Sequence, residues 1–174
     1  MPPRSTAIPG REAGLLPEPG EHVVLGAPLN GPWPEGTHVI YLAGGCFWGV
    51  ERIMWRRPGV VATAVGYMGG TTPNPTYQEV CTGATGHAEA VRVAYDPAVV
   101  GEDGKALLRT FWENHDSTRL NRHGNDIGTQ YRSAVWTTTP AQRDAALRIR
   151  EAFQGELTRL GLGTCVTTIE DAAD

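Results

Sequence analysis

The sequence predicts an α/β fold, more specifically a two-layer α/β sandwich. Stretches with strand character recur along the chain, stretches with helical spacing of apolar residues lie between them, and glycine or proline marks the boundaries. The expected strands are residues 39–43, 60–65, 88–95, 133–137 and 165–169. Strands that alternate with helices at this density form two packed layers. Periodicity alone does not distinguish a parallel sheet from a mixed one.

The first expected strand leads directly into a helix. Residues 39–43 read Val-Ile-Tyr-Leu-Ala, an apolar run that is typical of a buried strand. A glycine turn follows, and apolar residues then recur at helical spacing until the Arg-Arg-Pro-Gly sequence at 56–59 stops the helix. Cys46 therefore opens a helix at a strand-to-helix turn.

A long loop separates the second and third expected strands. Residues 66–86 are rich in glycine and proline, and loops of this length inside compact domains are usually functional. A strand at 88–95 follows this loop, and a helix is expected at 105–115.

The last long helix has clear end signals. Thr139 is the expected cap, Pro140 the first helical residue and Gly161 the stop. The expected apolar stripe of this helix consists of Ala146, Ile149, Phe153, Leu157 and Leu160. The final strand, at 165–169, comes before an acidic chain end.

Length and proline content predict one domain with an N-terminal extension. The 174 residues, 40% of them hydrophobic, can bury one substantial core. Prolines recur throughout residues 1–36, which we expect to be an extended, Pro/Gly-rich arm on the surface of a single domain at 37–174. A packed extension is favoured over a recognition role for the proline-rich segments.

Charge and cysteine content limit the partners. The net charge of −4 and the lack of a basic run argue against a nucleic acid or an anionic membrane, so we expect a small-molecule or peptide substrate. The three cysteines are too few for a disulfide scaffold and form no Cys-x-x-Cys pair, which suggests a reducing compartment. The sequence has no apolar run typical of a signal peptide or a membrane span, and we expect a cytoplasmic protein.

Cys46 is the first candidate for chemistry. Unpaired amides and the positive end of the helix dipole stabilise a thiolate, which is the nucleophilic form of cysteine. The alternative is that Cys46 is a small apolar core residue, as most cysteines are. The flanking Gly44, Gly45 and Gly49 argue against that alternative, because they remove side chains where another group approaches closely.

Glu89 is the second candidate. Period-two alternation places it on the apolar face of the strand at 88–95. Burial raises the pKa of a carboxyl group, and a carboxyl group that is protonated at neutral pH is a general acid. The alternative is that Glu89 is solvated at the strand end or pairs with Arg92 or His87, and the residues alone leave both readings open.

Six motifs follow one another in this chain: GCFWG at 45–49, GYMGG at 66–70, NPTY at 74–77, TGHAEA at 85–90, FWENHD at 111–116 and GNDIGTQYRS at 124–133. Together they closely resemble the A-type peptide methionine sulfoxide reductases. The resemblance implies a mixed sheet with a ferredoxin-like core. It also implies a catalytic domain that reduces methionine-(S)-sulfoxide, free or protein-bound, through a cysteine sulfenic acid. The two sulfoxide epimers have separate enzymes.

The resemblance assigns the two central roles and two hydrogen-bond donors. Cys46 matches the family's nucleophile and Glu89 its catalytic acid. Tyr77 and Tyr131 match tyrosines that donate hydrogen bonds to the sulfoxide oxygen. Taken alone, loop tyrosines are more often packing residues than catalytic ones.

Three further residues are expected to contact substrate. Phe47 and Trp48 would form the wall that receives the S-methyl group, and their alternative is ordinary core packing. Asp126 would, by the same resemblance, hydrogen-bond near the substrate or the oxidised Cys46. Its alternative is a turn aspartate, which Asn-Asp sequences commonly supply.

A metal site is the competing interpretation for one cluster: His115, Asp116, His123 and Asp126. Two imidazoles and two carboxylates could bind zinc or iron, but their spacing matches no standard ligand motif. The resemblance implies no metal and no organic cofactor, with electrons from thioredoxin or another thiol reductant. We expect a monomer.

Family members generally continue beyond residues 167–169 with a segment that helps to line the pocket and a tail that carries resolving cysteines. The chain is therefore expected to be a naturally short or truncated member. This leaves an alternative function open, a module that binds oxidised methionine without turning over. A third and weaker interpretation is a cysteine-dependent acyl transferase, which would require a thioester intermediate.

Overall fold

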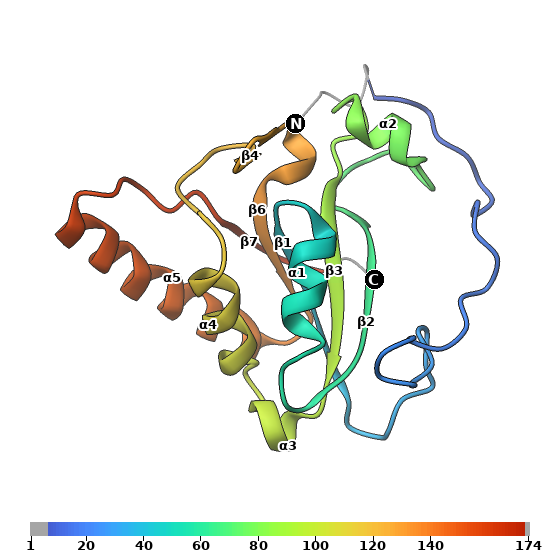
Figure 1. The fold of residues 1–174 in the computed structure, drawn as a ribbon, viewed down its shortest axis with the longest axis horizontal. Coiled ribbons are helices and arrows are strands. Elements are labelled where there is room, and N and C mark those ends of the chain that lie inside the picture. Colours follow the sequence, from blue (N-terminus) through green and yellow to red (C-terminus); the bar gives the residue numbers. More distant parts are fainter. Residues whose placement is uncertain (1–6, 173–174) are drawn as a thin grey trace.

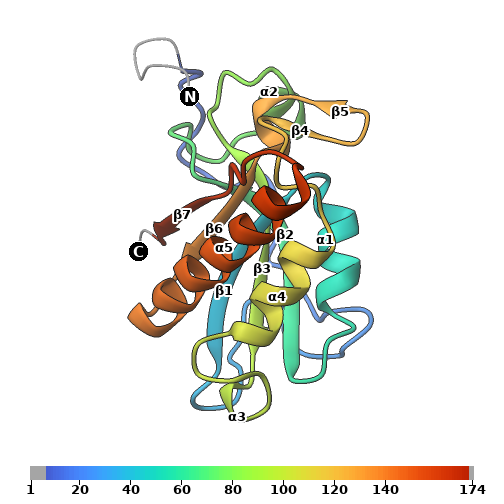
Figure 2. The same cartoon turned by 90° about the vertical axis from the view of Figure 1, so that its left-hand side faces the viewer.

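The computed structural model describes residues 7–172; residues 1–6 of the expected arm and 173–174 of the expected domain lie outside the described residues. A five-stranded sheet runs in the order β2-β3-β1-β6-β7. The helices α1, α4 and α5 cover one face of this sheet (Figures 1 and 2). All neighbouring strands are antiparallel except the parallel pair β6 and β7. The predicted fold class, a two-layer α/β sandwich with a mixed sheet, is confirmed.

The helices and strands have these bounds: β1 His38–Gly44, α1 Phe47–Met54, β2 Val60–Met68, α2 Tyr77–Cys81, β3 Ala88–Tyr95, α3 Pro97–Val100, α4 Lys105–Glu113, β4 Arg122–His123, β5 Asp126–Ile127, η2 Thr129–Tyr131, β6 Ser133–Thr137, α5 Pro140–Leu160 and β7 Thr168–Asp171. The short elements α2, α3, β4, β5 and η2 were not expected from the sequence, because elements of two to five residues are too short to show a period.

Two expectations about the last elements are wrong. The final strand begins at Thr168 rather than at Cys165, because the amide of Cys165 donates to the Gln154 side chain and the amide of Val166 donates to Ser117, so neither pairs in the sheet. Leu160 is 54% exposed and does not belong to the buried stripe of α5. The last turn of this helix extends past the sheet, as Figure 1 shows.

The main core lies between the sheet and the helices. Its buried side chains come from β1, β3 and β6 on the sheet side and from α1, α3, α4 and α5 on the other. The opposite face of the sheet carries a smaller cluster of mostly small residues around Trp136: Ala43, Ala88, Ala90 and Ala134. Small side chains on that face leave room above the sheet, which matters for a groove described below.

Residues 7–36 run along the β2 side of the sheet and form no helix or named strand. Arg92 on β3 donates to the carbonyl of Leu29 at 2.6 Å and to the Asn30 side chain at 2.8 Å. We call residues 7–36 the arm from here on. The arm is therefore fixed to the back of the sheet by a charge-assisted contact.

A second anchor joins the arm to helix α1. The Nδ1 atom of His22 accepts hydrogen bonds from the amides of Val24 and Leu25, so Nε2 carries the proton and donates to Thr63 at 2.8 Å. Thr63 in turn donates to the carboxylate of Glu51 at 3.1 Å. This buried relay connects the arm, β2 and α1. Among the described residues, no helix has both the length and the apolar character needed to span a membrane.

Candidate active site

Cys46 caps the N-terminus of α1, as the sequence predicts. Its side chain makes no capping hydrogen bond, so the sulfur is not used to satisfy the helix. Gly45 has a φ of +100°, and a Cβ atom there would overlap the ring of His123. A Cβ atom on Gly44 would lie 3.0 Å from Phe111 and 3.3 Å from His115. The close approach expected at these glycines is thus made by the protein's own side chains, which fix the turn that presents Cys46.

Glu89 lies at the same helix end. It is 2% exposed, and its Oε2 atom accepts the amide proton of Phe47, the residue after Cys46, at 2.9 Å. Burial raises the pKa of Glu89, the Phe47 amide opposes this shift, and the charge of Asp126 adds to it. The structure therefore places a buried carboxyl group with a raised pKa at the helix end that the candidate nucleophile caps.

Neither alternative partner of Glu89 contacts it. His87 accepts the amide of Gly70 at Nδ1 and donates from Nε2 to the carbonyl of Thr72. Arg92 points to the arm on the opposite face of the sheet. The readings in which Glu89 is solvated or paired with either residue are therefore wrong.

Tyr77 and Tyr131 lie within electrostatic range of this carboxyl group. Tyr77 is the first residue of α2, and its hydrogen bond to Cys81, one turn further along, raises its pKa to about 12. Burial raises the pKa of Tyr131, and the charges of Glu89 and Asp126 raise it further. Both phenols therefore keep their protons at neutral pH and can donate hydrogen bonds.

Phe47 and Trp48 differ sharply in exposure. Phe47 is 6% exposed and belongs to the main core, with its ring 5.2 Å from that of Trp48 and 5.9 Å from that of Tyr67. Trp48 is 65% exposed and lies two residues after the candidate nucleophile Cys46. Core packing thus applies to Phe47, and Trp48 is the aromatic residue that can meet a ligand.

Asp126 lies on the two-stranded hairpin of β4 and β5, opposite His123. Its side chain is exposed, and its charge raises the pKa of both Glu89 and Tyr131. The hairpin therefore brings Asp126 towards the other candidate residues.

In the structure, His115 of the candidate metal cluster is hydrogen-bonded to other parts of the protein. His115 contacts the carbonyl of Phe111 through Nδ1 and the hydroxyl of Ser133 through Nε2, both at 2.7 Å. A carbonyl only accepts, so Nδ1 carries the proton and Ser133 donates to Nε2. Burial lowers the pKa of His115 to about 4, and both nitrogens are occupied. Within residues 7–172, no group of three His, Cys, Asp or Glu side chains is placed to hold a metal ion.

Sequence reasoning missed the support of Tyr77. Thr76 and Glu79 form a reciprocal capping box that begins α2 at Tyr77. Arg11 of the arm binds Glu79 with two hydrogen bonds of 2.8 Å, and this contact, together with the Thr76 amide, lowers the pKa of Glu79 to about 2. The Thr-x-x-Glu spacing at 76–79 was the available signal for the helix. Nothing local in the sequence indicates Arg11, which is 68 residues away.

We expect Arg11→Ala to lower the kcat/KM of the reaction at Cys46 about five-fold, because it removes the bidentate ion pair with Glu79, whose two side chains are 33% and 23% exposed. The reason is that Glu79 loses the partner that holds the capping box, so Tyr77 becomes less fixed. Hydrogen exchange should accelerate at the amides of residues 77–82, and Arg11→Lys should restore part of the loss.

The matched control is Arg109→Ala, which removes an exposed ion pair with Glu113 on α4. It should change neither kcat/KM nor exchange in residues 77–82. Unchanged exchange in the Arg11 variant would show that the arm does not position Tyr77.

The fold and the site together define a class of protein. Cys46, Cys81 and Cys165 are all free thiols, and Cys46 caps a helix whose first amide donates to a buried carboxyl group with a raised pKa. A nucleophilic thiol with an adjacent acid on an α/β sandwich is the arrangement of a thiol-dependent oxidoreductase.

Comparison with known proteins agrees with this class. The family model described as peptide methionine sulfoxide reductase matches residues 38–173. The peptide methionine sulfoxide reductase MsrA of Brucella anthropi is 54% identical over 174 residues, which are 100% of this chain and 78% of the relative. The chain belongs to the peptide methionine sulfoxide reductase family.

Solved structures give the same result. Methionine sulfoxide reductase A of Corynebacterium diphtheriae matches with a TM-score of 0.89 and 44% identity, covering 97% of this chain and 79% of that one. Mxr1 from Saccharomyces cerevisiae, solved in complex with Trx2, matches with a TM-score of 0.56 and 25% identity, covering 82% and 81%.

Proposed function

We propose that this chain reduces the S epimer of methionine sulfoxide, free or within a polypeptide, to methionine, with Cys46 as the nucleophile. One observation carries the assignment: the Glu89 carboxyl group accepts the Phe47 amide at 2.9 Å, at the helix end that Cys46 caps. A soft sulfur nucleophile and a proton donor are thus on adjacent groups, as reduction of a sulfoxide requires.

The proposed step balances without a cofactor. The Cys46 thiol and the sulfoxide become a Cys46 sulfenic acid and methionine, so the cysteine sulfur is oxidised by two electrons and the substrate sulfur is reduced by two. Glu89 supplies the proton for the sulfoxide oxygen. Tyr77 and Tyr131, whose raised pKa values keep them protonated, donate hydrogen bonds to the same oxygen.

The remaining site residues are proposed to hold the substrate. Trp48 offers its exposed indole ring to the S-methyl group, and Phe47 supports that ring from the core. Asp126 lies on the hairpin near Tyr131 and would hydrogen-bond with the substrate or the oxidised Cys46.

Regeneration of Cys46 is proposed to depend on an external thiol, thioredoxin or another dithiol. The thiol of Cys165 donates to Thr167 at 3.4 Å, which supports this proposal, whereas Cys81 is exposed at the end of α2 and is addressed by the test below. The relative Mxr1 was solved in complex with Trx2. We also propose that the chain works in a reducing compartment such as the cytoplasm, because all three of its cysteines are free. We further propose that it works as a monomer.

The test is methionine release per enzyme. With excess dithiothreitol, we expect many turnovers, whereas a module that only binds oxidised methionine would release none while still binding a sulfoxide peptide. Without reductant, we expect one methionine per enzyme and a mass gain of one oxygen on Cys46, and the Cys165→Ser control should behave identically. A stoichiometric disulfide of Cys46 with Cys81 or Cys165 would show that regeneration is internal.

A further inference from the structure

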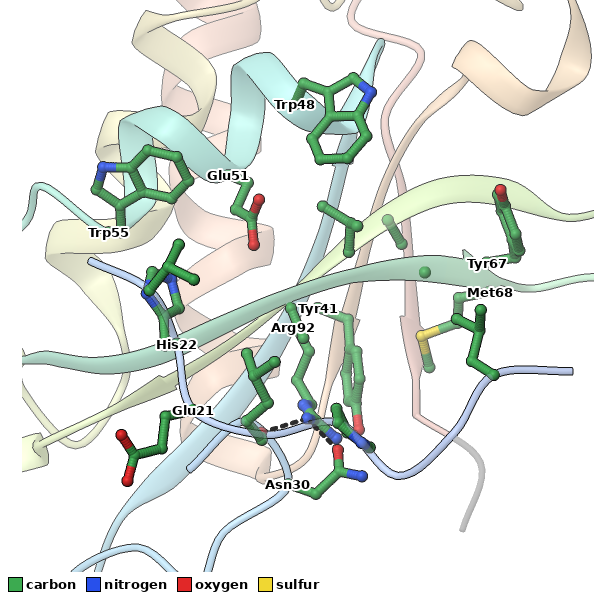
Figure 3. Close-up of a pocket in the computed structure, with 18 of the residues that line it drawn as sticks. Glu21, His22, Asn30, Tyr41, Trp48, Glu51, Trp55, Tyr67, Met68 and Arg92 are labelled. Carbon is green, nitrogen blue, oxygen red and sulfur yellow. Dashed lines mark hydrogen bonds between the residues drawn. The ribbon is translucent and has the colours of Figure 1, made fainter. Parts of the chain in front are cut away.

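A groove with a volume of about 680 Å³ lies between β2, α1 and the arm. Figure 3 shows Trp48 and Trp55 of α1 on one side of the strands, and Tyr41 and Arg92 on the other. The groove therefore passes around the edge of the sheet and reaches both of its faces. No residue with a proposed role in the chemistry other than Trp48 lines it.

The strand along this groove has a free edge. β2 is the outermost strand of the sheet and pairs only with β3. Alternate residues of a strand point their N–H and C=O groups away from the paired neighbour. In the described part of the chain, no backbone hydrogen bond joins residues 64–68 to the arm or to any segment other than β3. The Met68 carbonyl accepts from the Arg132 side chain at 3.4 Å, and the outward-facing backbone groups of residues 64–67 have no hydrogen-bond partner among the described residues.

The rim of the groove is apolar and exposed. Leu16 is 87% exposed, Val23 98% and Trp48 65%, and all three line the same groove. The groove is open over β2 and β3 because the cross-strand neighbours Gly66 and Ala90, which both line it, have no side chain or only a methyl group. Apolar side chains gathered around such an open slot are typical of a surface that binds an apolar partner.

The groove is continuous with the candidate active site. Trp48 is shared by both, and Tyr67 lines the groove while its ring lies 5.9 Å from that of Phe47. Tyr67 is also the cross-strand neighbour of Glu89. The opposite end is filled by His22, which is hydrogen-bonded to Thr63. A chain that enters at Trp48 can therefore extend along β2 as far as His22.

We propose that, in a polypeptide substrate, the residues beside the oxidised methionine lie extended in this groove and pair with the free edge of β2 as an added strand. Backbone hydrogen bonds then supply affinity for any extended segment, and alternate side chains pack between Trp48 and Leu16. The lining contains the carboxyl groups of Glu21 and Glu51 and the guanidinium group of Arg92 among mostly apolar side chains, so apolar flanking residues are favoured. The inference rests on the proposed function and names its substrate class: unfolded or extended segments with apolar neighbours.

The first test fills the groove. A Cβ atom on Gly66 meets no atom within 4 Å, so Gly66→Leu can be accommodated and projects a side chain into the slot. We expect the ratio of kcat/KM for a short sulfoxide peptide with apolar flanks to that for free methionine sulfoxide to fall at least about ten-fold, the cost of excluding one apolar side chain. The matched control is Gly155→Leu on α5, also open, which should leave the ratio unchanged.

The second test probes the backbone. Peptides N-methylated at successive flanking amides should show an alternating response, with KM raised when the methyl group removes a donor that faces β2 and little changed at the next position. An unchanged ratio in Gly66→Leu, or a response without alternation, would overturn the proposal. A dimer in the parent that Gly66→Leu dissociates would show that a second copy of the chain occupies the groove instead. If free methionine sulfoxide is not reduced at all, the proposed function fails rather than this inference.

Discussion

Cys46→Ser is expected to lower kcat/KM for methionine sulfoxide by about 10⁴-fold or more, the largest effect of any single change in this chain. A serine hydroxyl stays protonated at neutral pH and is a poor nucleophile for sulfur. The measurement is methionine release under excess dithiothreitol. No mass gain of one oxygen should appear at position 46 after exposure to substrate.

The same substitution carries its own folding control. Serine is a preferred N-cap residue, and the Cys46 side chain makes no capping bond, so Cys46→Ser should unfold at the parental temperature or above it. Lost activity then reports chemistry and not misfolding. Reduction at the parental rate would remove Cys46 from the mechanism.

Glu89→Gln is expected to lower kcat about 10²–10⁴-fold while leaving sulfoxide-peptide binding intact, because general acid catalysis typically contributes that factor. The amide oxygen of glutamine can still accept the Phe47 amide at the position where the carboxylate does, so the shape of the site is kept. An unchanged rate near neutral pH would leave Tyr77 or Tyr131 as the proton donor.

The pH dependence of Glu89 has a defined sign. Its pKa is raised, so the protonated form persists above the ordinary carboxyl range, and the rate should fall as pH rises through the raised value. The protonated group also contributes stability below the ordinary pKa of glutamate, which is lost as pH rises through the folded-state pKa. Glu89→Gln should therefore flatten the alkaline limb of the rate profile and should not destabilise the protein at neutral pH.

Elements with local signals were predicted well. β3 occupies the expected residues, and α5 begins after Thr139 and ends before Gly161, because caps, proline and glycine act within one turn of their own position. The strand β2 continues three residues beyond the expected end, to Met68, because β3 offers cross-strand partners that the glycine-rich sequence does not reveal. Pairing between strands is thus the part that local patterns miss.

In the candidate site too, local sequence signals predicted the position of a residue but not its distant partner. The helix-capping position of Cys46 follows from its neighbours in sequence, but the partner of Glu89 is the Phe47 amide, 42 residues away. The period-two alternation of the strand predicted that Glu89 lies on the apolar face, but it did not predict which group Glu89 contacts. Arg11, which supports Tyr77 through Glu79, could not be found from local sequence because only the folded chain brings these residues together.

The anchors of the arm have a consequence for synthesis of the chain. The arm is synthesised before its partners: Glu79 follows Arg11 by 68 residues, Thr63 follows His22 by 41 and Arg92 follows Leu29 by 63. At about 5–20 residues per second, these partners emerge roughly 2–14 s after the arm residues that they bind. The arm therefore cannot dock before β2 and β3 have been made, and the groove that it borders is completed only after these two strands have formed.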